Sequence, residues 1–328
     1  MRRRDVIALA MALAVRPATA FAQAGGRQRR VGFLGTWGEG DAEGMVRQDR
    51  FRQRLKELGW TEGGNLELAS RYGDNSAERI RRGAAELMAL APDAVVSTTS
   101  TTTQALMDAG GNIPIVAALS GDPVALGFTK SLSQPTANVT GFTTFNDTLA
   151  AKRVEMLHEI VPAIRTAALI WVPANPQQVL LERQTKEATK AQGIELLSLP
   201  VKSVADLAAA LTNARDQKVA ALIVAADPIT VGNDRLIIDQ CIAMKLPAMH
   251  TFLSEAKNGA LMAYGIDVLD SYRRTAEYVD QLLKGKRIAD LPFQEPTRFT
   301  LAINMKTARA IDIRIPSTVL ARADEVIE

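Results

Sequence analysis

Short apolar segments alternate with amphipathic segments along most of the chain after residue 28, and this alternation restricts the fold more than any other feature. The near-continuous apolar runs predict buried strands, while the segments between them show helical periodicity. Strands that are apolar on both faces are typical of a parallel sheet covered by helices on both sides. The sequence therefore predicts an α/β fold. In the first half of the chain, strands are expected at 31–36, 65–72, 93–98 and 113–119.

A second round of the same alternation predicts further strands at 166–172, 194–201, 219–226 and 246–252. A chain of 328 residues is long enough for two lobes that each bury a core. We therefore predict two Rossmann-like lobes with parallel sheets joined by a hinge. The N-terminal lobe is expected at 28–142, completed by about 266–290, and the C-terminal lobe at 143–265, completed by about 291–328.

The first 24 residues have the organisation of an export signal. A basic start, "MRRRD", precedes the apolar "VIALAMALAV" and the small-residue cleavage region "ATAFAQA". This apolar run is too short to cross a bilayer core of about 30 Å as a helix. We predict a cleavable signal peptide at 1–24 and a periplasmic protein, with twin-arginine export through Arg3 and Arg4 as one route. A buried N-terminal helix is the alternative.

Composition excludes several classes of protein. Cleavage after Ala24 lowers the basic residues from 39 and the acidic residues from 36 to 35 of each, so the mature chain has no net charge. A nucleic-acid partner then lacks electrostatic support. The single cysteine, Cys241, permits no internal disulfide, and no cysteine follows the signal to carry a lipid anchor. The two histidines, His158 and His250, have no ligand-spaced companions, so neither a metal nor a cofactor is expected.

Seven consecutive hydroxyl side chains, Ser97 to Thr103, lie between a predicted strand and a predicted helix. Thr101 and Gln104 match a capping box, which predicts a helix that begins at Thr102. Residues 97–100 would then form the turn above the helix N-terminus, where N–H groups and the helix dipole favour an anion or carboxylate. The alternative is that two hydroxyls cap the helix and the others face solvent.

Three strands run into Asp-Pro or Asn-Pro at their carboxyl ends, where ligands bind in open α/β sheets. Asp122, Asn175 and Asp227 are predicted N-caps, each followed by proline at the first helical position. Capping alone explains each instance, but three in the same topological place predict a cleft lined by both lobes. Trp37 and Tyr264 also follow predicted strands, and either bracket a ligand or pack the lobe interface. No nucleotide-binding loop or hydrolase motif is present, so no enzyme activity is expected.

Several segments resemble the ABC-transporter substrate-binding family that includes tryptophan-binding members. They are "KRVEMLHEIVPAIRTAALIWVPANP", "ALIVAADPITV", "GALMAYGIDVLDSYRRTAEYVDQLLKG" and "INMKTARAIDIRIPSTVLARADEVIE". The resemblance covers the mature chain and implies the architecture of type I periplasmic binding proteins. It also implies a monomer that delivers a small molecule to a membrane permease with a cytoplasmic ATPase. The cleft residues it implies are Thr36, Trp37, Ser97, Thr98, Thr99, Ser100, Thr101, Ser120, Asp122, Pro123, Asn175, Asp227, Tyr264 and Asp267.

These residues suggest a binding mechanism for an amino acid or related small carboxylate. We expect the turn from Ser97 to Thr101 to hold a carboxylate, and Asp227 or Asp267 to meet an amine or hydroxyl. Trp37 and Tyr264 would bracket the apolar part. A periplasmic protein that presents its ligand to a sensor or chemoreceptor, rather than to a permease, is the alternative.

Overall fold

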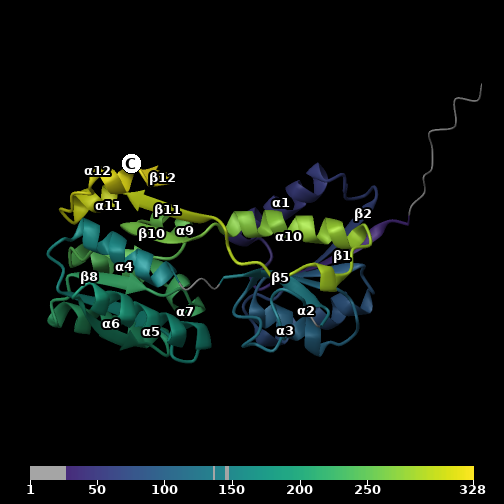
Figure 1. The fold of residues 1–328 in the computed structure, drawn as a ribbon, viewed down its shortest axis with the longest axis horizontal. Coiled ribbons are helices and arrows are strands. Elements are labelled where there is room, and N and C mark those ends of the chain that lie inside the picture. The colour runs from purple at the N-terminus through teal and green to yellow at the C-terminus, as the bar shows by residue number, and fades with distance from the viewer. Residues whose placement is uncertain (1–26, 136, 145–147) are drawn as a thin grey trace, which may run out of the picture.

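The computed structural model describes residues 27–135, 137–144 and 148–328, and the predicted signal peptide lies outside them. Two α/β lobes are visible side by side in Figure 1, each built around its own sheet. The prediction of two lobes with mainly parallel sheets is confirmed.

The first lobe contains a five-stranded parallel sheet in the order β2-β1-β3-β4-β5. Its central strands are apolar on both faces because helices cover both sides. The strands are β1 (Arg29–Gly35), β2 (Leu66–Tyr72), β3 (Ala94–Ser97), β4 (Ile115–Ser120) and β5 (Val139–Thr143). The helices that follow the first three strands are α1 (Ala42–Glu57), α2 (Ala77–Ala89) and α3 (Ser100–Asp108).

The long helix α10 (Val268–Leu283) belongs to this lobe although it comes late in the chain. It lies beside α1 and across β3, β4 and β5 (Figure 1). Tyr272, Ala276 and Val279 are completely buried on it and share a core with Phe33 and Phe51. These three residues of α10 are spaced three and four apart, so they lie on one face of the helix. This apolar face covers the second side of the sheet.

The second lobe contains a seven-stranded sheet in the order β12-β11-β10-β9-β8-β6-β7. It is parallel except between β10 and β11, which are antiparallel. Its strands are β6 (Thr166–Trp171), β7 (Glu195–Pro200), β8 (Ala221–Val224), β9 (Ala248–His250), β10 (Met262–Ile266), β11 (Phe299–Asn304) and β12 (Glu325–Ile327). Its helices are α4 (Leu149–Ile160), α5 (Pro176–Ala191), α6 (Val204–Asp216), α7 (Pro228–Val231), α8 (Asp234–Ala243), α9 (Leu253–Lys257), α11 (Met305–Ala310) and α12 (Ser317–Leu320).

The chain passes between the lobes three times: after β5, between β10 and α10, and before β11. A short 3-10 helix, η1 (Ile288–Asp290), precedes the last passage. Beyond it, the Phe293 N–H donates to the Leu132 carbonyl and the Gln294 N–H donates to the Gly141 carbonyl. Residues 293 and 294 are therefore hydrogen-bonded to the first lobe, close to the point at about 291 where the sequence predicts the return to the second lobe.

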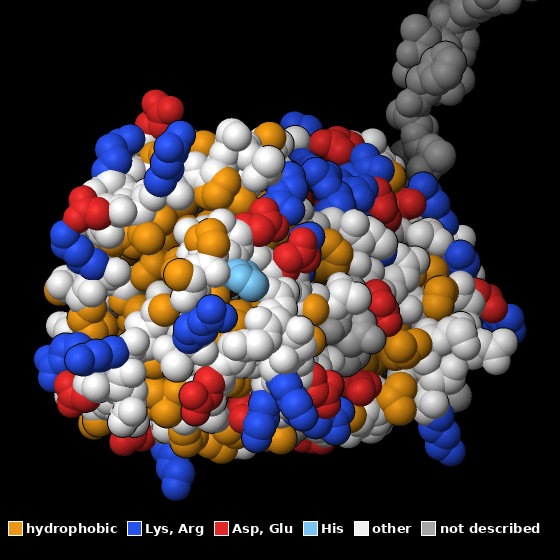
Figure 2. All heavy atoms as spheres, turned by 60° about the vertical axis from the view of Figure 1, so that its left-hand side comes forward, with side chains coloured by type: hydrophobic (Ala, Val, Ile, Leu, Met, Phe, Trp, Pro, Cys, Tyr) orange, Lys and Arg blue, Asp and Glu red, His pale blue; other side chains and the backbone are white. Residues whose placement is uncertain are grey.

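On the face of the molecule shown in Figure 2, basic and acidic side chains are interspersed with apolar ones. This distribution agrees with the equal numbers of basic and acidic residues after position 24.

Candidate functional site

The hydroxyl turn between β3 and α3 is held together by its own side chains. The Thr98 and Thr99 N–H groups both donate to Thr102 Oγ1, at 3.0 and 2.9 Å. Ser97 Oγ and Thr103 Oγ1 are hydrogen-bonded at 2.7 Å, completely buried. Thr98 Oγ1 accepts from the N–H of Thr36 at 3.1 Å. Most of these hydroxyls therefore stabilise the turn itself.

Three details of the prediction for this turn are wrong. The N-cap of α3 is Thr99, whose box partner is Thr102, so the helix begins at Ser100 and the predicted box of Thr101 with Gln104 does not form. Ser97 and Thr98 are completely buried, and their hydroxyls are hydrogen-bonded to those of Thr103 and Thr36. Only Thr99, Ser100 and Thr101 keep exposed surface. The hydroxyls of Thr102 and Thr103 both donate to the Thr99 carbonyl at 2.9 Å, so the first turn of the helix satisfies them internally.

In the second lobe, Asn175 and Asp227 are the N-caps of α5 and α7, as predicted. Their side chains also meet, since Asn175 Nδ2 donates to Asp227 Oδ2 at 3.1 Å. Gln178 Nε2 lies 3.4 Å from the same oxygen, and the Ile229 N–H donates to Asp227 Oδ1 at 3.1 Å. The two residues, 52 positions apart, thus form one half-exposed polar cluster at the carboxyl ends of β6 and β8.

One contact joins this cluster to the hydroxyl turn. Gly121, after β4 in the first lobe, donates its N–H to Ser100 Oγ at 2.9 Å. A Cβ at Gly121 would lie 2.1 Å from Gln177 Nε2, so the backbone is in direct contact with this side chain at the start of α5. Gln177 in turn donates its N–H to Asn175 Oδ1. A series of contacts through Gly121 and Gln177 therefore links Ser100 of the first lobe to Asn175 and Asp227 of the second.

Asp122 and Pro123 are next to this contact, but the helix predicted after them is absent. Asp122 Oδ1 accepts from the N–H groups of Val124 and Ala125, and residues 123–127 form a turn instead. Gly127 has a φ of +74°, a conformation that stops helix extension. The end of β4 at Ser120 lies beside Thr143 of β5; the Ser120 side chain lies outside the described part of the structure.

Trp37 lies inside the first lobe. The sequence alone leaves open whether it brackets a ligand or packs at the lobe interface. It is only 8% exposed and packs in the first-lobe core against Phe33 and Tyr272, with ring centroids 6.2 and 6.4 Å away. The Arg47 guanidinium lies 5.9 Å from its ring centroid. A Cβ at Gly44 would come within 2.2 Å of Trp37 Nε1, so the helix must carry glycine there. Trp37 is therefore a core residue of the first lobe, which differs from the lobe-interface packing that the sequence left as the alternative.

Tyr264 and Asp267 lie where β10 leaves the second lobe. The half-buried Tyr264 ring lies 6.1 Å from Phe299, the first residue of β11. Asp267 is the N-cap of α10 through Asp270 N, and its carboxylate lies 3.8 Å from Arg298 Nε. Both predicted residues are therefore at the passages between the lobes, and both already have intramolecular partners.

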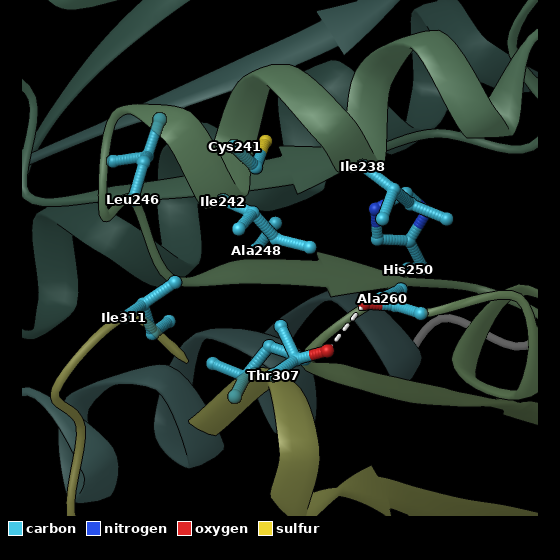
Figure 3. Close-up of a pocket in the computed structure, with 11 residues that line it drawn as sticks. Ile238, Cys241, Ile242, Leu246, Ala248, His250, Ala260, Thr307 and Ile311 are labelled. Carbon is cyan, nitrogen blue, oxygen red and sulfur yellow. Dashed lines mark hydrogen bonds between the residues drawn. The ribbon is translucent and has the colours of Figure 1, made fainter. Parts of the chain in front are cut away.

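Two cavities lie away from the carboxyl-end loops. A space of about 10 Å³ is enclosed between α8, β9 and α11, and Figure 3 shows the Cys241, His250 and Thr307 side chains around it. This is room for about one water molecule. A shallower depression of about 290 Å³ lies at the edge strand β7 beside α6, where Asp206 already accepts from the backbone of Lys202 and Ser203. The first is too small for a solute, and the second is an open depression on one lobe rather than a cleft between the two.

Two buried ionisable residues, His250 and Glu255, flank the loop after β9. Glu255 accepts from the Thr251 and Phe252 N–H groups at 3.0 and 2.7 Å and lies 3.2 Å from His250 Nδ1. Both side chains are at most 2% exposed. Burial raises the pKa of Glu255, but the hydrogen bond and charge of His250 and the two backbone donors outweigh it, so the pKa lies below its usual value. The ionised carboxylate fixes this loop beside the Asp227 loop.

Sequence reasoning missed three residues of this region: Gly121, Gln177 and Arg153. Gly121 is part of the "SGDP" segment, and its role is visible only from its contact with Gln177 in the folded structure. Arg153, in the "KRVE" segment of α4, is 4% exposed and donates Nε to the Tyr264 carbonyl at 2.8 Å. No local pattern marks an arginine as buried.

Within 27–135, 137–144 and 148–328, no group of three histidine, cysteine or acidic side chains is arranged to hold a metal ion. Over the same ranges, no helix has both the length and the apolar character needed to span a membrane.

Residues 39–327 match the family described as ABC transporter substrate binding protein. The chain belongs to this family. Because the family comprises solute-binding proteins, this ABC transporter substrate-binding protein is not an enzyme.

Relatives of the ABC transporter substrate-binding protein include a tyrosine-binding protein of Clostridioides difficile (strain R20291), 22% identical over 80% of this chain and 76% of the relative. A conserved domain protein from Vibrio cholerae is 27% identical, with a TM-score of 0.80 over 92% of this chain and all of the other. A structure from Streptococcus pneumonia in complex with L-Trp is 23% identical, with a TM-score of 0.82 over the same coverage. These likenesses agree with the two-lobe α/β fold.

Proposed function

We propose that this protein captures an amino acid or a related small carboxylate between its two lobes. Membership of the substrate-binding family supports capture of a solute. The names of two relatives support the ligand class, since one is a tyrosine-binding protein and the other binds L-Trp in its crystal. Cleavage of residues 1–24 would release the protein, as a monomer, into the periplasm. There it would deliver the ligand to a membrane permease and its ATPase.

The observation that carries this proposal is the contact between Gly121 and Gln177. It lies at the carboxyl ends of β4 and β6, one strand from each sheet, at the edge where α/β folds bind ligands. On one side of it stands Ser100 and on the other the Asn175–Asp227 pair. Closure of the lobes about the three passages would exclude water, so hydrogen bonds from both sides would become stronger.

The half-exposed residues of the predicted set have roles in this proposal. Ser100 Oγ accepts the Gly121 N–H, so its own O–H is left to donate to a ligand oxygen. Thr36, Thr99 and Thr101 line the same side. Asp227 or Asp267 would receive the amine or a hydroxyl, because a carboxylate oxygen accepts more than one hydrogen bond. The Tyr264 ring would contact the apolar part.

Isothermal titration of the mature protein with the twenty amino acids and matched carboxylates tests the proposal. A ligand at about a hundred times its dissociation constant should also stabilise the protein by about 2.7 kcal/mol in a thermal-shift assay. The double variant Ser100→Ala/Thr101→Ala should bind more weakly, whereas Thr212→Ala, an exposed hydroxyl on α6, is the control. Amino acids that neither bind nor stabilise the protein would contradict the proposed ligand class.

Uptake of the ligand by permease-containing vesicles, dependent on this protein, would support delivery. If the ligand binds but is not taken up, the alternative gains support, in which the loaded protein is presented to a sensor or chemoreceptor.

A further inference from the structure

Arg153 is a buried cation at the passages between the lobes. It stands one turn into α4, directly after the first passage, and only 4% of its surface is exposed. Its Nε donates to the carbonyl of Tyr264 at 2.8 Å. The pairing of β10 with β9 ends at Ala263, so this carbonyl lies just beyond the ladder, where Arg153 can reach it.

The charge of Arg153 has no carboxylate partner in the part of the chain that the structure describes. Glu255 is the acidic residue whose charge acts on it, yet no ion pair joins the two. The Glu255 oxygens are occupied by His250, Thr251 and Phe252. Burial lowers the pKa of Arg153 to about 10, opposed by the charges of Glu255 and Tyr264, so the guanidinium is charged at pH 7. A buried cation without a counter-charge is costly to the fold.

The remaining N–H donors of Arg153 are on the two terminal nitrogens of its side chain. Its hydrogen bond in the described structure uses Nε, which leaves the two terminal nitrogens with four N–H groups. The unpaired side-chain atoms that are sealed from solvent belong to Arg30, Trp37, Arg52, His250 and Tyr272. The Arg153 terminal nitrogens are not among them, so they are not completely sealed, and the 4% of the residue that is exposed is where a ligand would approach.

The surroundings of Arg153 suit the anionic end of an aromatic or apolar solute. Tyr264, whose carbonyl it holds, is half-buried, and the Tyr264 ring lies against Phe299 at 6.1 Å with an interplanar angle of 31°. Both aromatic residues border passages between the lobes, where β10 ends and β11 begins. A planar guanidinium fork binds a carboxylate in a bidentate manner, with two parallel hydrogen bonds.

We propose that the terminal nitrogens of Arg153 bind the carboxylate of the solute captured between the lobes. This inference rests on the proposed function and assigns the carboxylate to the second lobe, where sequence reasoning gave it to the hydroxyl turn. The hydroxyl turn then meets another polar group of the solute. The bound carboxylate supplies the counter-charge that Arg153 lacks among the described residues.

Isothermal titration with paired acids and amides tests the inference. The probes are L-tyrosine with L-tyrosinamide, L-tryptophan with L-tryptophanamide, and phenylacetate with phenylacetamide. The wild-type protein should bind each preferred acid about 10- to 100-fold more tightly than its amide, the range expected for hydrogen bonds to a charged group. Arg153→Gln should reduce this ratio to near one, and Arg153→Lys should retain part of it. Arg165→Gln, an exposed arginine before β6, should leave the ratio unchanged.

The ratio of acid affinity to amide affinity distinguishes a carboxylate-binding role of Arg153 from a purely structural role. If Arg153 only holds α4 to β10, Arg153→Gln lowers stability and weakens acids and amides alike, and an unchanged ratio overturns the inference. Should Arg153→Gln fail to fold, an unchanged ratio in Arg153→Lys overturns it equally. Equal binding of acid and amide by the wild type overturns the inference but leaves amino-acid capture intact. Binding of phenylacetate without amino acids supports Arg153 and refutes the amino-acid ligand. No binding of any carboxylate refutes both.

Discussion

Replacement of Glu255 by glutamine should destabilise the second lobe by about 2–3 kcal/mol at neutral pH. Its carboxylate accepts two backbone N–H groups at 3.0 and 2.7 Å and faces His250 Nδ1 at 3.2 Å, all without access to water. A hydrogen bond to a charged group contributes about 1 kcal/mol more than one to a neutral group. Glutamine keeps one acceptor oxygen, so two to three bonds lose their charge assistance while the shape is preserved.

The effect should depend on pH in a defined direction. Since the folded pKa of Glu255 is lowered below its ordinary value of 4.5, the ionised form stabilises the fold above that pH. This stabilisation is lost as the pH falls through the folded pKa, where the carboxylate becomes protonated. The difference between wild type and Glu255→Gln should therefore be full at pH 7 and should shrink below pH 4.5.

Urea unfolding followed by circular dichroism at pH 7 and at pH 3 measures this difference. Glu195→Gln, an exposed carboxylate at the start of β7, is the matched control and should change stability by less than about 0.5 kcal/mol. Equal destabilisation of Glu255→Gln at both pH values, or a loss below about 0.5 kcal/mol at pH 7, would refute the argument that the ionised carboxylate stabilises the loop.

Three further outcomes are expected. Gly141→Ala should cost more than about 3 kcal/mol or prevent folding, because φ is +146° and a Cβ would lie 2.1 Å from the Ala117 oxygen; thermal melting measures this. Ser97→Ala should cost about 1 kcal/mol through the lost bond to Thr103, yet leave ligand affinity unchanged in titration. The Cys241 thiol, whose pKa burial raises to about 12, should react with iodoacetamide at pH 8 only in urea; rapid labelling of the folded protein would contradict its burial.

Local chemistry was enough to predict two of the helix caps. Asn175 and Asp227 cap their helices as the sequence indicated, because a short polar side chain can satisfy N–H groups two or three residues ahead. The same rule failed where hydroxyls compete. In the tract from Ser97 to Thr103, several residues could cap α3. The cap is Thr99, because the hydroxyl of its neighbour Thr98 is already bonded to Thr36.

The sequence by itself determined the two-lobe α/β class, most of the strands and the edge of each sheet where ligands are expected, since these follow from periodicities within some ten residues. The short strands β5 and β12 were not predicted. Only the tertiary structure decided which polar groups face each other across that edge. Gly121 against Gln177, Asn175 beside Asp227, and Arg153 beneath Tyr264 all join residues distant in the chain. The tertiary structure also decided which residues are buried, because the packing of whole helices and strands encloses Trp37 and Ser97 inside the first lobe. It also left the guanidinium of Arg153 without a carboxylate partner in the part of the chain that the structure describes.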